Sequence, residues 1–161
     1  SQPQPEIGYR SDVISFVTEP LTEDLSIAGK ISADLTVSTD VDDTCFTYTV
    51  SEVGPDGATY NIRSGITTLA YRNDPLGDRQ TYTPNEVVEI TIETLPITWN
   101  VKAGNRIRVD ITSSNFPEYS VHSNYAGVWS EQAETRVANQ TIYIGDTYAS
   151  TVTFPTLSLD K

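Results

Sequence analysis

Residues 25–37 read LSIAGKISADLTV, and this stretch decides the fold. Its apolar residues share one parity along the chain: Leu25, Ile27, Ile31, Ala33, Leu35 and Val37. Successive side chains of a β-strand point to opposite faces, so this set lines one face and leaves Lys30, Asp34 and Thr36 on the other. Gly29 interrupts the alternation, which indicates a bulge or a bend. The stretch therefore predicts a β-strand with one buried face.

The same alternation recurs in short runs, and the expected strands cover residues 13–18, 46–50, 59–62, 66–71, 88–92, 95–101, 107–111, 137–145 and 151–159. The parity switches between Ile92 and Leu95, close to Pro96, as in a strand that changes sheet at a corner. No run shows the period of about 3.6 residues that an amphipathic helix requires. We therefore expect an all-β fold, an antiparallel jelly-roll β-sandwich.

The chain has 161 residues and a net charge of −12. This length fits one domain, and we expect residues 1–11 to form a linker or disordered lead and residues 12–161 to form a single jelly-roll domain. The negative charge repels a phosphate backbone, so no nucleic-acid partner is expected. No apolar run approaches the roughly 18–20 residues of a membrane span, and residues 1–6 lack the pattern of a signal peptide. We expect a soluble chain, and its compartment stays open.

The sequence carries little that could catalyse a reaction. The Gly-x-Ser-x-Gly elbow of an α/β-hydrolase nucleophile is missing. His122 is the only histidine and lies in a loop, so we interpret it as a surface or interface residue. Cys45 is the only cysteine, and the apolar run beside it predicts a buried, inert thiol. No glycine-rich phosphate loop is present, and no cofactor or catalytic residue is expected.

A metal site has weak support. One histidine and one cysteine cannot supply the three or four ligands that zinc usually takes. Asp40, Asp42 and Asp43 are a weak candidate for calcium, because carboxylate oxygens are its preferred ligands. Their spacing does not match the twelve-residue loop of a helix-loop-helix calcium site. A solvated acidic turn is the favoured interpretation, and no bound metal is predicted.

The segment 113–134 gathers aromatic side chains: Phe116, Tyr119, Tyr125 and Trp129, with the imidazole of His122 among them. Aromatic residues on a loop often mark a contact surface for protein or sugar. They can equally pack across the open end of a sandwich as a small second core, and both interpretations stay open. Trp99 differs, since it shares the parity of Leu95 and Ile97 and is expected in the main core.

Residues 12–57, DVISFVTEPLTEDLSIAGKISADLTVSTDVDDTCFTYTVSEVGPDG, resemble the opening of a known domain. Three later pieces fit the same pattern in the same order: SGITTLAYR at 64–72, KAGNRIRVDITSSNFPEY at 102–119 and SNYAG at 123–127. The pattern is similar to that of the C-terminal non-catalytic domain of the X-Pro dipeptidyl-peptidase and cocaine esterase family of α/β-hydrolase serine enzymes. Two departures stand out, because Asn105 replaces the usual histidine and residues 121–123 replace an Arg-Asn pair.

The resemblance implies a jelly-roll sandwich similar to galactose-binding-like modules. In the family this domain follows an α/β-hydrolase domain that carries the Ser-Asp-His triad, and the parent cleaves X-Pro dipeptides, esters or acyl-amides. No member of the triad can be placed on this chain, which we therefore do not expect to be an enzyme by itself. Its expected partner is the catalytic domain of the same parent chain, which it would pack against while shaping the substrate cleft.

The residues expected to make such contacts are Phe116, Pro117, Tyr119, His122, Asn124, Tyr125 and Trp129. The alternative is a stand-alone carbohydrate-binding module, in which the same aromatic side chains stack on sugar rings. Fold by itself does not decide between these two functions.

Overall fold

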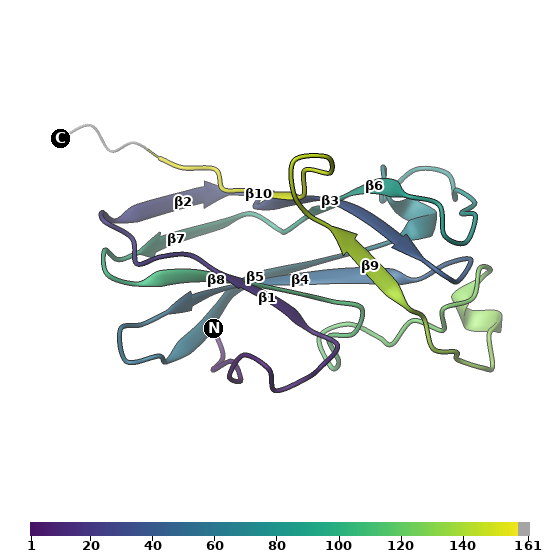
Figure 1. Cartoon of the computed structure of the whole chain (residues 1–161), viewed down its shortest axis with the longest axis horizontal. Helices are drawn as coiled ribbons and strands as arrows, with labels where there is room; N and C mark the ends of the chain where they lie inside the picture. The colour runs from purple at the N-terminus through teal and green to yellow at the C-terminus, as the bar shows by residue number, and fades with distance from the viewer. Residues whose placement is uncertain (158–161) are drawn as a thin grey trace.

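The chain folds as two antiparallel layers of strands, in a computed structural model that describes residues 1–157. The first sheet has the order β1 (Ile14–Val17), β8 (Arg106–Thr112), β4 (Cys45–Val53) and β5 (Thr59–Thr68). In the second layer β3 (Ser32–Thr39) pairs with β6 (Val88–Glu93), β9 (Gln140–Tyr143) and β10 (Thr151–Thr153), and β2 (Leu25–Gly29) pairs with β7 (Ile97–Val101). Figure 1 shows both layers edge-on. This arrangement confirms the expected antiparallel β-sandwich.

The stretch 25–37 forms one ribbon with a bend, because β2 and β3 are separated only by Lys30 and Ile31. Gly29 has a φ of 133°, and a side chain there would lie 3.2 Å from Pro155 Cγ. The bend is closed by Thr94, whose N–H donates to Ile31 O (2.9 Å) and whose Oγ1 accepts from Ile31 N–H (3.0 Å). The neighbouring ribbon consists of β6 and β7 and is interrupted at the same bend. β6 pairs with β3, and β7 pairs with β2. Both the bend at Gly29 and the parity switch after Ile92 are therefore confirmed.

The core lies between the layers and is built from the predicted parity. From the second layer it takes Ile27, Ile31, Ala33, Leu35, Val37, Ile90 and Ile92, and from the first Phe46, Tyr48, Val50, Ile107, Val109 and Ile111. Tyr48 is fully buried, and its hydroxyl donates to Ile31 O at 2.7 Å. This bond joins the layers at the bend and gives Ile31 O a second donor beside Thr94 N–H.

The two layers touch closely along the side where β5 faces β6. At Gly65 in β5 an added Cβ would lie 2.9 Å from Tyr48 Cε1, 3.0 Å from Ile92 Cγ2 and 3.1 Å from Glu93 O. Only a residue without a side chain fits this approach. The sandwich is therefore closed along the β5–β6 side.

Several boundaries differ from the expected ones. Residues 59–62 and 66–71 were expected as two strands, but β5 runs unbroken and ends in a 3-10 turn at Leu69–Tyr71. The polar middle of β5 stays in the strand because it pairs with β4, with a register shift between Val50 and Ser51. β9 and β10 are shorter than expected, and residues 158–159 lie outside the described part. Trp99 packs against the core but is only partly buried, because its indole N–H donates to Glu52 Oε2 (2.9 Å).

Residues 1–11, expected as a linker or disordered lead, cross the outer face of the first sheet and bind to it by hydrogen bonds. Gln4 N–H donates to Thr59 O (2.8 Å), and Arg108 donates to Pro5 O (2.7 Å). This covering explains why Arg108 and Asp110, which point away from the core, are buried as an ion pair with a separation of 2.8 Å. A buried charge requires a partner and further hydrogen bonds, and the lead supplies one of them.

The close approach at Gly65 gives a test of the layer packing. We expect Gly65→Ala to lower the free energy of unfolding by about 1–3 kcal/mol, because the new methyl group overpacks the contact with Tyr48 and Ile92. Denaturant unfolding measures the change. Glu89→Ala, an exposed change on β6, is the control and should stay within about 0.5 kcal/mol of the unchanged protein. Equal stability of the two variants would contradict a close contact between β5 and β6.

Candidate functional site

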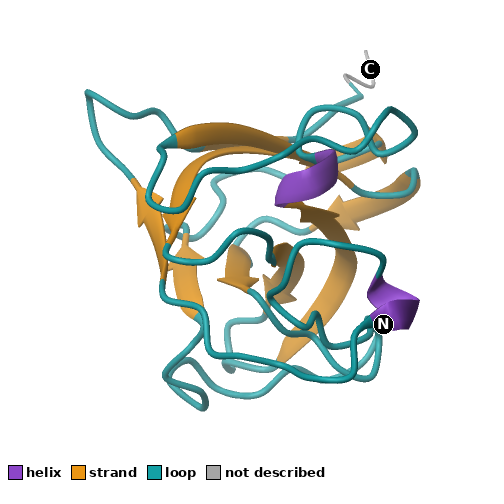
Figure 2. Ribbon diagram, turned by 90° about the vertical axis from the view of Figure 1, so that its right-hand side faces the viewer, coloured by secondary structure: helices purple, strands orange, loops and turns teal. Residues whose placement is uncertain are grey.

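Three loops meet at one end of the sandwich and form the candidate site. They are the β3–β4 turn at 40–44, the β5–β6 connection at 69–87 and the long β8–β9 connection at 113–139. Figure 2 looks onto this end, where the two 3-10 turns, Leu69–Tyr71 and Trp129–Glu131, mark the second and third loops. Residues far apart in the sequence thus come together here.

The acidic turn divides its three carboxylates among different partners. Asp40 accepts hydrogen bonds from the backbone N–H and the side-chain amide of Asn139 (2.8 and 2.7 Å), and these bonds hold the pKa of Asp40 below its usual value. Asp42 pairs with Arg136 and accepts from Ala126 N–H (3.0 Å). Within residues 1–157 no group of three or more histidine, cysteine, aspartate or glutamate side chains is placed to hold a metal. The turn therefore fastens loops.

Asp43 departs most from the expected solvated turn, since it is 4 % exposed. Its Oδ1 accepts from the backbone N–H groups of Thr44 (2.9 Å) and Ala70 (3.2 Å). Its Oδ2 lies 3.5 Å from Arg79 and 3.9 Å from Nε2 of His122. Burial raises the pKa of Asp43, and the nearby His122 and the backbone N–H groups oppose this change. The result is a buried carboxylate between two basic side chains from two other loops.

His122 was expected as a surface or interface residue, and 14 % of its side chain is exposed. Its Nδ1 accepts from the backbone N–H of Asn124 (3.0 Å), so the neutral ring carries its proton on Nε2, facing Asp43. Burial lowers the pKa of His122, and the charge of Asp43 opposes this effect. Cys45 lines one hollow together with Asp43 and His122. Its thiol donates to Ser113 O (2.9 Å), and burial raises the pKa of the thiol to about 11. This imidazole orders a loop, and the thiol beside it is held as the unreactive protonated form.

Asn124 and Tyr125, both expected to make external contacts, bind within the chain. Asn124 has a φ of 67° and bonds to Thr44 Oγ1 (2.8 Å) and Arg136 O (2.6 Å). Arg136 donates from Nε to Asn124 O (2.7 Å), and its guanidinium carbon lies 4.2 Å from the centre of the Tyr125 ring. Arg136 therefore clamps the loop, through hydrogen bonds, an ion pair and a cation–π contact.

Phe116, Pro117 and Trp129 remain exposed beside this fastened region. Phe116 is 71 % exposed and Trp129 is 58 % exposed. Trp129 borders a hollow of about 480 Å³, whose other walls include Ile66, Tyr71 and Tyr119 and whose floor includes Asp43 and His122. Tyr119 is half-buried and its hydroxyl lies 3.1 Å from Ser64 Oγ. The aromatic segment thus divides, with Tyr125 and Tyr119 held inward and Phe116 and Trp129 outward.

Arg79 and Arg136 are the site residues that sequence reasoning missed. Each meets a carboxylate of the acidic turn, across 36 and 94 positions of the chain. The chain has only 10 basic residues against 22 acidic ones, so a lone arginine in a loop was a weak signal for an ion pair. Sequence spacing could not indicate which acid each arginine would meet.

Fold and site together describe a β-sandwich that offers a structured loop surface and has its lone histidine and cysteine tied up internally, as in a non-catalytic domain. Residues 2–153 match the model of the X-Pro dipeptidyl-peptidase C-terminal non-catalytic domain, and the chain belongs to this family. It is 34 % identical over 154 residues to cocaine esterase of Rhodococcus sp. (strain MB1 Bresler). The aligned region covers 94 % of this chain and 27 % of the esterase.

Two solved structures contain a similar domain. An aminopeptidase from a marine sediment Thaumarchaeota archaeon superimposes with a TM-score of 0.84 and 26 % identity, over 94 % of this chain and 27 % of that one. An alpha-amino acid ester hydrolase superimposes with a TM-score of 0.83 and 24 % identity, over 94 % of this chain and 26 % of that one. This similarity supports the fold. The chain thus spans about a quarter of the length of these relatives. Within the described residues, no helix has the length and apolar character needed to cross a bilayer.

The clamp made by Arg136 can be tested by substitution. We expect Arg136→Ala to lower the free energy of unfolding by about 1–2 kcal/mol, because charge-assisted hydrogen bonds to Asn124 and Asp42 are lost at a partly exposed site. Hydrogen exchange should show faster exchange of the amides at 123–127. Arg136→Lys keeps the charge without the planar fork and should restore only part of the loss. Unchanged exchange in Arg136→Ala would contradict the clamp.

The lone histidine predicts a pH dependence. Because the pKa of His122 is lowered in the folded state, the unfolded chain binds a proton first as the pH falls through its own value near 6.5. The free energy of unfolding of the unchanged protein, relative to that of His122→Gln, should therefore fall between pH 7.5 and pH 5.5. The raised pKa of Asp43 has the opposite effect on stability, because the folded chain binds this proton before the unfolded chain does. Its contribution to the free energy of unfolding grows as the pH falls, down to the unfolded pKa of about 3.9.

Denaturant unfolding of both proteins across this pH range measures the difference. An advantage that grows on acidification would contradict the prediction. It would mean that a charged pair between His122 and Asp43 outweighs the cost of burying the imidazolium.

Proposed function

We propose that this chain is the accessory C-terminal β-sandwich of a serine hydrolase, and that its loop end docks on the α/β-hydrolase catalytic domain of the same parent chain. In this role it helps to shape the substrate cleft. Family membership supports a hydrolase parent, and the chain's share of about a quarter of its relatives' length leaves room for a catalytic domain.

The single observation that carries the docking site is the exposed aromatic pair beside a fastened loop. Phe116 and Trp129 project from the 113–139 connection, which is held by the bond of Arg136 to Asn124 O and by the bond of Ala126 N–H to Asp42. Large exposed apolar side chains are typical of interaction sites, and their fixed backbone reduces the entropy lost on binding. A partner surface could bury both rings and fill the hollow that Trp129 borders.

The relatives' names support a proposal for the parent's activity. These relatives are called an esterase, an aminopeptidase and an ester hydrolase, which share attack on an ester or peptide carbonyl. We propose that the parent hydrolyses such a bond, as a dipeptidyl-peptidase or an esterase. The triad would lie in the catalytic domain, and this chain would contribute a wall of the cleft and no reacting group.

The docking proposal predicts the effect of charge at the two exposed rings. In the intact hydrolase we expect Phe116→Asp and Trp129→Asp each to lower kcat/KM about tenfold, equivalent to about 1.4 kcal/mol, because a carboxylate would be desolvated at the interface. Steady-state kinetics and thermal unfolding measure the effect. Leu95→Asp, at a position 71 % exposed between β6 and β7 and outside the three loops of the site, is the matched control and should change neither.

If Phe116→Asp and Trp129→Asp behave like Leu95→Asp, the loop end is not the docking surface. Two further measurements separate the other functions. A shift of the unfolding midpoint by millimolar oligosaccharide would favour a carbohydrate-binding module. Ester hydrolysis by the chain alone that disappears in His122→Ala would contradict a non-catalytic role.

A further inference from the structure

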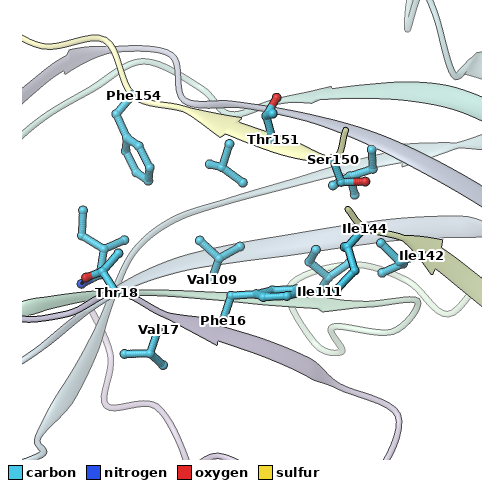
Figure 3. Close-up of a pocket in the computed structure, with 13 residues that line it drawn as sticks. Phe16, Val17, Thr18, Val109, Ile111, Ile142, Ile144, Ser150, Thr151 and Phe154 are labelled. Atoms are coloured by element: carbon cyan, nitrogen blue, oxygen red, sulfur yellow. Dashed lines mark hydrogen bonds between the residues drawn. The ribbon is translucent and has the colours of Figure 1, made fainter. Parts of the chain in front are cut away.

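The sandwich is closed along one side and open along the other. On the β5–β6 side the layers touch at Gly65, as described above. On the opposite side the edge of the first sheet is β1, and the edge of the second layer is formed by β9 and β10, which both pair with β3. Between these edges lies a slot of about 300 Å³. Figure 3 shows the slot, with Phe16, Val109 and Ile111 on one wall and Phe154, Thr151 and Ile144 on the other.

The slot exposes side chains that belong to the core face. Ile14 and Phe16 of β1 stand opposite Ile111 and Val109 of β8 and therefore point inward with them. Yet Phe16 is 40 % exposed and Ile144, beyond the end of β9, is 64 % exposed. Inward-facing residues of this kind are normally buried, so this part of the core lacks its cover.

The chemistry of the slot defines what could cover it. Its lining contains only aliphatic and aromatic residues with Thr18, Ser150 and Thr151, and no charged side chain. The outer edges of β1, β9 and β10 form no ladder within residues 1–157, and they flank the slot. An extended segment with apolar side chains satisfies both requirements, because its backbone can pair with an edge while its side chains enter the gap.

We propose that an apolar β-segment of the same parent polypeptide, from outside residues 1–161, occupies this slot and completes the sandwich. The chain matches a C-terminal domain and covers 27 % of the relative's length, so much more polypeptide is expected. A covalently attached segment has a high effective concentration at the slot. A second copy is disfavoured, because each copy carries a net charge of −12 and the two would repel each other.

A photo-cross-linking experiment on the intact hydrolase tests this proposal. The photoreactive residue p-benzoylphenylalanine replaces Phe16, which preserves an aromatic ring at the slot, and the same residue at Leu95, outside both the slot and the loop end, serves as the exposed control. We expect a cross-link within one polypeptide from position 16 to a peptide outside residues 1–161, identified by mass spectrometry. A cross-link to a second copy, a cross-link only within residues 1–161, or a yield equal to that at position 95 would overturn the proposal.

A second measurement does not depend on the photoreactive residue. Ile144→Cys and Leu95→Cys place a thiol at positions that are 64 % and 71 % exposed in this chain. In the intact hydrolase we expect a maleimide to label position 144 at least tenfold more slowly than position 95. Equal rates would overturn the proposal. Neither result bears on the loop end, which Phe116→Asp and Trp129→Asp test separately.

Discussion

Burial of one face of the bent β2–β3 ribbon against β4 and β8 is the interaction on which the rest of the structure depends. Ile27, Ile31 and Val37 are fully buried in this interface, and Tyr48 ties the opposite layer to the bend through Ile31 O. At roughly 1.5–3 kcal/mol for each large apolar side chain, this layer contact is the main favourable term of the fold. The bend at Gly29 allows one ribbon to follow the twist of the opposite sheet.

The loop end depends on that frame in a direct way. β3, β5 and β8 end there and β4, β6 and β9 begin there, so the three connections are brought together although they lie far apart in sequence. Charged groups then fix the loops, with Asp42 and Asp43 each meeting an arginine from another connection. Such pairs are effective here because backbone N–H groups satisfy the remaining carboxylate lone pairs. The surface that results is rigid at Arg136 and apolar at Phe116 and Trp129.

The two long sides of the sandwich differ for a related reason. Gly65 lets β5 and β6 meet, whereas β1 and β10 are short edge strands that leave a row of core side chains partly open. A domain that forms part of a larger hydrolase can leave surface of this kind for another segment to cover. The lead at residues 1–11 already acts in this way on the outer face, where it covers Arg108 and Asp110.

The amino-acid sequence by itself determined the strand pattern and the core face, because the period of two in residues 25–37 and 107–111 is a local property of the chain. It also identified the family, through ordered motifs that cover most of the chain. Only the tertiary structure decided that Asp43 is buried, that Asn124 and Tyr125 point inward, and that residues 1–11 cover a sheet. Those outcomes depend on contacts between groups that lie up to 103 positions apart along the chain, and the spacing of residues in the loops does not indicate which groups will meet.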